Sequence, residues 1–145
     1  MFESGAILIY LAERSGRLLA RDGAERYHAL QWLNWQMGGI GPMFDQLGFF
    51  AVRSTDKAPL AITRFTEEGQ RLLTVLDRQL QASAYLAGEN YTIADIAAYP
   101  WMLAATTFLG SVLGPSIGAM PAVKRWLNAI GEREAVKRGL AVPKV

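Results

Sequence analysis

Apolar residues recur every three or four positions along most of this chain, which is the spacing of one helix face. Alternating apolar and polar runs flanked by turn residues are missing, so no strands are expected. The pattern predicts an all-α chain. Its helices should cover about residues 4–14, 24–50 and 60–83, with another helix opening after Thr92. Met120 and Pro121 should open a last long helix that runs through Val123, Trp126, Leu127 and Ile130.

The ends of the first two helices carry local signals. Ser4 is expected to cap the first helix, and Gly16 to end it in the left-handed conformation. In the second helix, residues 38–42 read Gly-Gly-Ile-Gly-Pro, which predicts a kink or a close backbone approach because glycine and proline both weaken a helix. Residues 52–59 should form a loop, and the tail after Arg138 should be irregular.

The strongest helix-start signal surrounds Thr92 and Asp95. They have the spacing of a capping box, in which each side chain bonds the other residue's backbone amide, and Tyr91 and Ile96 have the spacing of a hydrophobic staple. Asp95 is therefore interpreted as structural, with a loss of about 1–2 kcal/mol if the cap is removed. The helix it opens should be the central core helix, bent at Pro100.

The stretch between Asp95 and Lys124 has no charged residue and is long enough to span a bilayer. Prolines and glycines interrupt it repeatedly, which favours a buried core helix followed by a turn, rather than a membrane span or an interface.

Composition narrows the chemistry. The 145 residues fit one domain, and 51% of them are hydrophobic, which is enough for a real core. The net charge of +2 is spread along the chain, so no nucleic-acid partner is expected. The chain has no cysteine and one histidine, His28, so it offers no disulfide, no thiolate nucleophile and no zinc site. A filled core without disulfides suits the cytoplasm.

Four segments together resemble the glutathione transferase family. Residues 2–7 (FESGAI) resemble the end of its thioredoxin-like domain, where an acidic residue and a serine begin the last helix. Residues 91–95 (YTIAD) resemble the capping box of its helical domain. Residues 31–43 (QWLNWQMGGIGPM) resemble the bacterial Nu class and its yeast prion-like relatives, which bind glutathione and reduce disulfides, and residues 120–126 (MPAVKRW) also fit.

The resemblance implies a glutathione transferase C-terminal-like helical bundle over residues 17–145. Residues 1–16 then correspond to the last helix of the thioredoxin-like domain. The strands and helices that hold the thiol-activating residue in the family are not among these residues. The expectation is a chain that lacks most of the glutathione-binding domain.

The resemblance also implies a glutathione site. Glu3 and Ser4 would bind the ammonium and the carboxylate of the γ-glutamyl group, because a helix N-terminus offers free amides and a partial positive charge. Without the resemblance, Ser4 is only a cap and Glu3 a solvated charge. Arg64 would reach the same site from the helical domain, the alternative being an ion pair with Glu67 or Glu68.

Trp32, Trp35 and Gln36 would line the pocket for a hydrophobic electrophile or a disulfide, the alternative being core packing. Thr92 and Asp95 stay structural. No catalytic residue and no metal ligand can be assigned within this chain.

Three functions remain open. The first is a glutathione transferase-like protein, a cytoplasmic homodimer that uses glutathione as co-substrate to modify electrophiles or reduce disulfides. The second is a non-catalytic helical dimerisation or interaction module. The third is a binder of apolar molecules at the tryptophan cluster.

Overall fold

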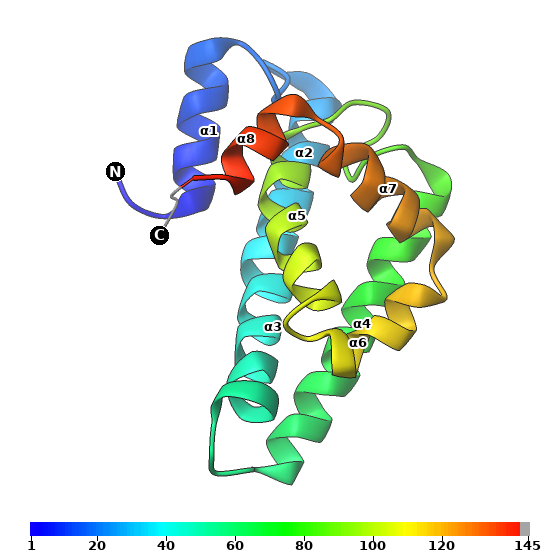
Figure 1. Ribbon diagram of the computed structural model, residues 1–145. Helices are drawn as coiled ribbons and strands as arrows, with labels where there is room; N and C mark the ends of the chain where they lie inside the picture. The colour runs from blue at the N-terminus through cyan, green and yellow to red at the C-terminus, as the bar shows by residue number, and fades with distance from the viewer. Residues whose placement is uncertain (143–145) are drawn as a thin grey trace.

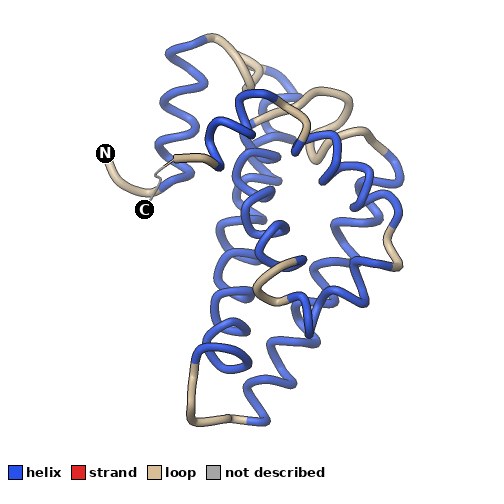
Figure 2. Tube along the Cα trace, in the orientation of Figure 1, coloured by secondary structure: helices blue, strands red, loops and turns tan. Residues whose placement is uncertain are grey.

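In the computed structural model, which describes residues 1–142, the protein is entirely helical (Figures 1 and 2). Within those residues, the only extended pairing is an isolated bridge between Tyr85 and Gly88. The predicted all-α class is confirmed. The helices are α1 (Ser4–Ser15), α2 (Gly23–Trp35), α3 (Gly41–Gly48), α4 (Pro59–Ala82), α5 (Ile93–Thr106), α6 (Gly110–Gly118), α7 (Pro121–Gly131) and α8 (Glu134–Leu140), with π-helical turns η1 (Gln36–Ile40) and η2 (Phe49–Arg53).

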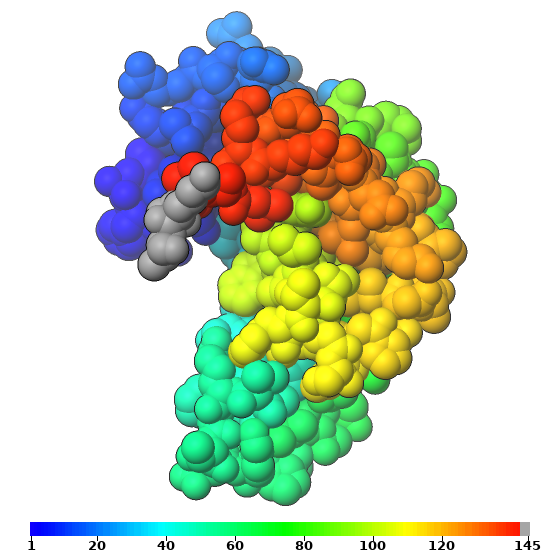
Figure 3. Space-filling model, in the orientation of Figure 1, coloured from blue at the N-terminus to red at the C-terminus, as the bar shows by residue number. Residues whose placement is uncertain are grey.

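Helix α5 is the centre of the bundle. It packs against α1, α2, α3, α6 and α7, whereas α4 lies along α3 and also meets α6 and α7. Helices α1 and α8 lie at one end of the molecule, and the turn between η2 and α4 lies at the other (Figures 1 and 3). The expectation that the capped helix is the central core helix is therefore confirmed.

Two apolar clusters hold the bundle together. The larger cluster surrounds α5, and the smaller cluster packs α1 against α2 and α5. The largest side chains that are fully buried in these clusters are Trp126, Phe44, Leu33, Ile40, Leu47, Leu72, Leu73, Leu76, Leu80, Leu86, Ile93 and Met102.

Two predictions near the ends of the chain are wrong. Ser4 is the first helical residue and not the cap, because Glu3 precedes the helix at φ 68° without a capping side-chain bond. The sequence predicts a single long last helix, but α7 ends at Gly131 and a further helix, α8, begins at Glu134. The tail predicted to be irregular after Arg138 is therefore helical as far as Leu140. Residues 143–145 lie outside the described residues. Gly16 does end α1 at φ 65°, as predicted.

The interruption predicted at residues 38–42 takes the form of a π-helical turn. Helix α2 passes through η1 into α3 with helical backbone angles at both junctions. A π turn adds a residue to the helix and rotates the helical turns that come after it. It brings Gly41 against the buried Gln36: an added Cβ at Gly41 would lie 2.9 Å from Gln36 Nε2.

This close approach predicts that Gly41→Ala lowers the free energy of unfolding by about 1–3 kcal/mol, because Gln36 must move within a packed core. Gly38→Ala in the same turn is a matched control, because its Cβ would meet nothing within 4 Å. That variant should be neutral or more stable by up to about 1 kcal/mol. Urea denaturation of both variants checks this, and equal effects would contradict the assignment.

The charge-free stretch forms α5, a short turn and α6. No single helix among residues 1–142 is long and apolar enough to cross a membrane. Helices α5 and α6 reach that length and apolar character only when taken together, and they are bent by 109° relative to each other.

Candidate functional site

Asp95 is the best-connected polar side chain in the described core. It is fully buried at the start of α5 and accepts four hydrogen bonds. Its Oδ2 accepts from the Thr92 amide (2.9 Å) and hydroxyl (3.2 Å), and its Oδ1 accepts from the Leu86 amide (3.0 Å) and Trp126 Nε1 (2.8 Å). The predicted capping box is confirmed, and the same carboxylate also ties α5 to α7 and to the loop after α4.

The surroundings of Asp95 affect its ionisation in two opposite ways. Burial raises the pKa of its carboxyl group, and the hydrogen bonds from Leu86, Trp126 and Thr92 counteract part of that rise. The carboxylate has no access to solvent. Its position and its full set of donors identify a structural group, as the sequence predicted.

Glu3 and Ser4 lie at the exposed N-terminus of α1. The Glu3 side chain makes no ion pair within residues 1–142, and the Ser4 hydroxyl makes only a long contact of 3.9 Å with Met37 Sδ on η1. The first amides of the helix have no intrahelical partner. This end of α1 therefore presents hydrogen-bond donors and one free carboxylate, which suit a ligand that carries both a carboxylate and an ammonium group.

Arg64 lies on the exposed side of α4, in its second turn. From the sequence, Arg64 could either reach a glutathione site or pair with Glu67 or Glu68. No such ion pair of Arg64 forms within residues 1–142, and Glu68 pairs with Arg71 instead, at 2.7 Å. The hydrogen bond from Arg71 lowers the pKa of Glu68, with a smaller contribution from the charge of Arg64. The beginning of α4 lies at the end of the molecule remote from α1 (Figure 1). One chain therefore does not bring Arg64 to Glu3 and Ser4.

Trp32, Trp35 and Gln36 are adjacent at the end of α2. The two indoles pack edge to face with centroids 4.9 Å apart, and both are half-buried against the core. Gln36 is 3% exposed, and its Oε1 has no hydrogen-bond partner in the described residues. The two indoles thus form one partly exposed aromatic pair, whereas the Gln36 side chain faces the core, where its Nε2 lies beside Gly41.

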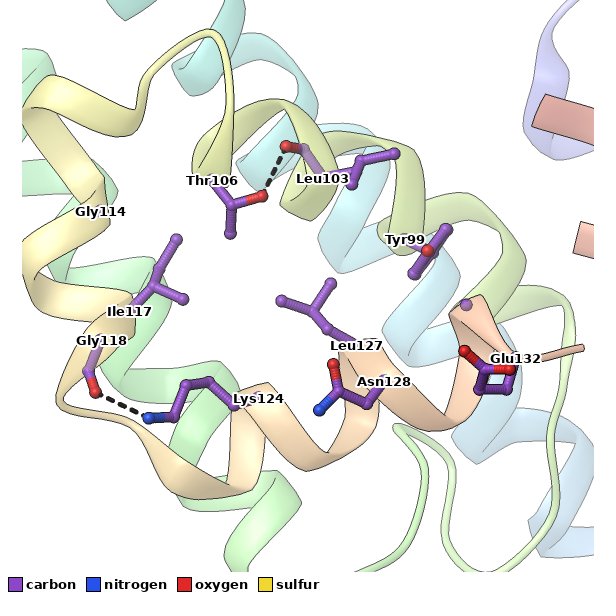
Figure 4. Close-up of a pocket in the computed structure, with 11 residues that line it drawn as sticks. Tyr99, Leu103, Thr106, Gly114, Ile117, Gly118, Lys124, Leu127, Asn128 and Glu132 are labelled. Atoms are coloured by element: carbon purple, nitrogen blue, oxygen red, sulfur yellow. Dashed lines mark hydrogen bonds between the residues drawn. The ribbon is translucent and has the colours of Figure 1, made fainter. Parts of the chain in front are cut away.

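Two surface hollows were not predicted from the sequence. One lies between α1, α5 and α8, has a volume of about 560 Å³, and includes Tyr91, Arg17 and Arg133. The Arg133 guanidinium lies 3.9 Å from the Tyr91 ring centroid, and burial raises the pKa of Tyr91 to about 12. The other lies between α5, α6 and α7 (Figure 4). Both are built from residues distant in sequence, so no local motif signals them.

Comparison with known proteins agrees with this arrangement. The family model "Glutathione S-transferase, C-terminal domain" matches residues 43–134. Disulfide-bond oxidoreductase YfcG of Escherichia coli is 45% identical over 140 residues, covering 97% of this chain and 63% of that protein. Disulfide-bond oxidoreductase YghU of the same organism is 42% identical over 146 residues, covering 98% and 50%. The chain thus spans about half to two-thirds of the length of these relatives.

Solved structures show the same fold with glutathione bound. A glutathione transferase from Burkholderia graminis, with two glutathione molecules per subunit, superposes with a TM-score of 0.93 at 45% identity, over 99% of this chain and 61% of that one. A glutathione transferase from Pseudomonas putida, with one glutathione disulfide per subunit, gives 0.91 at 45% identity, over 99% and 63%.

Proposed function

Because this chain belongs to the glutathione S-transferase family, we propose that it is the helical part of a glutathione-dependent disulfide reductase. The observation that carries the proposal is the 45% identity to a disulfide-bond oxidoreductase over 97% of this chain. Transfer of glutathione to electrophiles is the related activity of the family, and it uses the same bound thiolate.

These 145 residues include no cysteine and so cannot themselves supply a thiol, and the proposal therefore assigns the chemistry to the sulfur of glutathione. A glutathione thiolate attacks one sulfur of the disulfide, the S–S bond breaks, and the released thiolate takes up a proton. A second glutathione thiolate then attacks the mixed disulfide. The products are glutathione disulfide and two thiols. The protein's contribution is to hold and orient the thiol and the disulfide.

The residues of this chain that fit glutathione are Glu3 and Ser4. The Glu3 carboxylate suits the γ-glutamyl ammonium, and the Ser4 hydroxyl and the free amides of α1 suit the γ-glutamyl carboxylate. Both groups are exposed and have no competing ion pair in the described residues. Trp32, Trp35 and Gln36 would form one wall for the disulfide or electrophile.

The proposal includes a homodimer in the cytoplasm, where glutathione is kept reduced. The position of Arg64 supports the dimer, because α1 and the start of α4 lie at opposite ends of one chain. In a two-fold dimer the same pair of surfaces meets twice. Arg64 of one subunit would then hold the glutathione carboxylate at Glu3 and Ser4 of the other.

Calorimetric titration with reduced and oxidised glutathione tests the proposal. We expect saturable binding to the native chain, and binding at least about tenfold weaker after Glu3→Ala with Ser4→Ala, because two charge-assisted contacts are lost. Glu25→Ala, an exposed first-turn glutamate of α2, is the matched control and should bind as the native chain does. No heat at millimolar glutathione would favour a non-catalytic interaction module.

A further inference from the structure

We propose that Met37 is a site of oxidation by peroxides, and that its sulfoxide weakens glutathione binding at the N-terminus of α1. Met37 lies on η1, and its partly exposed side chain packs against the smaller apolar cluster. Its Sδ lies 3.9 Å from Ser4 Oγ, although the two residues are 33 positions apart in the chain. The thioether therefore contacts a residue of the proposed glutathione site.

The methyl end of the Met37 side chain packs on the backbone of α1. A Cβ added at Gly5 would lie 3.1 Å from Met37 Cε and 3.6 Å from Met37 Sδ. Gly5 thus leaves the space that the thioether and its methyl group fill. Met37 joins the π-helical turn to the first turn of α1, directly beside Glu3 and Ser4, so a change at its sulfur acts on this end of the helix.

Met37 differs from the other methionines in this respect. The chain has five methionines and no cysteine, so methionine carries all of its sulfur. Met102 is fully buried, whereas Met1 is 77% exposed, so oxidation at Met1 removes little packing. Met43 and Met120 are partly exposed like Met37, but they pack against the larger cluster and not against α1. Met37 is therefore the methionine that combines access to solvent with contact to the proposed site.

The reaction needs a peroxide, R–O–O–H, as the oxidant. A lone pair of the Met37 sulfur attacks the terminal peroxide oxygen, the O–O bond breaks, and an S–O bond forms. The leaving alkoxide takes the proton of the transferred hydroxyl group. The products are methionine sulfoxide and the alcohol R–O–H. The sulfur loses two electrons, and the peroxide gains them.

The sulfoxide changes both contacts of Met37. A thioether is a weak acceptor, whereas the sulfoxide oxygen is polar and accepts a hydrogen bond well. An oxygen bonded to this sulfur competes with the γ-glutamyl carboxylate for the Ser4 hydroxyl. The added oxygen also needs space beside Gly5, so the first turn of α1 must shift. The effect on binding rests on the proposed glutathione site, but the oxidation and the shift of α1 do not.

Oxidation of the ¹⁵N-labelled full chain with hydrogen peroxide tests the proposal. Peptide mass mapping should show Met37 oxidised at least about tenfold faster than the buried Met102. The NMR spectrum should show shifted amides of Ser4 and Gly5. After the peroxide is removed, calorimetric titration should show reduced glutathione bound about tenfold more weakly than by the untreated chain, the change expected for one charge-assisted contact.

Met37→Leu keeps an apolar side chain of similar volume that peroxide does not oxidise. Its glutathione affinity and its Ser4 and Gly5 amides should be the same before and after peroxide treatment. Met43→Leu is the matched control, because Met43 is also partly exposed but packs against the larger cluster. This variant should still lose affinity about tenfold on oxidation, as the native chain does. Thermal unfolding verifies that both variants are folded.

Two outcomes would overturn the proposal: Met37 oxidised no faster than Met102, or the same response to peroxide in Met37→Leu and the native chain. If the untreated native chain binds no glutathione, the proposed function fails, and the amide shifts still decide the oxidation site. Ser4 and Gly5 shifts that occur in the native chain and not in Met37→Leu would then support it, and their absence from the native chain would refute it.

Discussion

Replacing Asp95 with alanine should lower the free energy of unfolding by about 3–5 kcal/mol, the largest effect expected of any single substitution considered. The sequence alone predicts a smaller loss of about 1–2 kcal/mol, the scale of one helix cap. The structure raises this value because Asp95 Oδ1 also accepts from the Leu86 amide and the Trp126 indole, and Trp126 is fully buried. Alanine leaves these buried donors without partners.

Urea denaturation followed by tryptophan fluorescence measures this change as a shift of the midpoint at constant slope. Asp45→Ala is the control. Its carboxylate pairs with Arg53 at 2.7 Å, but both side chains are about half exposed, so the loss should stay below about 1 kcal/mol. Equal midpoints for the Asp95→Ala variant and the native chain would show that the buried network contributes nothing.

Asp95→Asn separates the shape of this group from its charge. Asparagine keeps one acceptor for Leu86 and Trp126 but turns an N–H group toward the Thr92 amide, so an intermediate loss is expected. Burial raises the folded-state pKa of Asp95 above its unfolded value near 3.9. At pH values between the unfolded and the folded pKa, the folded protein binds more protons than the unfolded protein. As the pH falls through this range, the free energy of unfolding of the native chain should therefore rise relative to that of the asparagine variant. If the difference in free energy of unfolding between the native chain and the asparagine variant narrowed as the pH fell, the raised pKa would be contradicted.

The features that the sequence predicts well are the ones specified locally. The capping box needs only Thr92 and Asp95, three residues apart, and helix periodicity needs only neighbouring turns. The partner of Asp95 in α7 is 31 residues away, and nothing in the apolar spacing around Trp126 indicates that its indole donates to a carboxylate. The four-donor site of Asp95 is thus a tertiary property.

The wrong or incomplete predictions have the same origin. Proline and glycine in residues 38–42 indicate an interruption, and the close approach that they predict is found at Gly41, but the π turn itself depends on how Gln36 and Gly41 pack against each other. Gly131 ends α7 and Arg133 immediately precedes α8, and neither gives a cap motif that would mark a new helix at Glu134. Among the candidate site residues, Glu3 and Ser4 belong to one motif, whereas the position of Arg64 relative to them is determined only by the fold.

A mixture of two binding-deficient variants should recover glutathione binding if Arg64 acts across a dimer interface. Variant one carries Glu3→Ala and Ser4→Ala, and variant two carries Arg64→Ala. Each should bind glutathione at least about tenfold more weakly than the native chain, because each loses a charge-assisted contact in every site. Arg78→Ala, which removes another exposed arginine of α4, should bind like the native chain.

In a mixed dimer, the two sites differ. One combines the altered Glu3 and Ser4 with the altered Arg64, whereas the other combines native residues at all three positions. Random exchange makes about half of the dimers mixed, so about a quarter of all sites should regain native affinity. Calorimetry of the equilibrated mixture measures this fraction as the stoichiometry of tight binding.

If Arg64 instead served the site of its own chain, every site in the mixed dimer would still contain one altered partner, and mixing would recover nothing. The stoichiometry of tight binding therefore distinguishes the two arrangements. Light scattering of the mixture verifies that dimers form and exchange. The separation of α1 from the start of α4 within one chain favours recovery, because an arginine side chain, about 7 Å long when extended, cannot cross the length of a helical bundle.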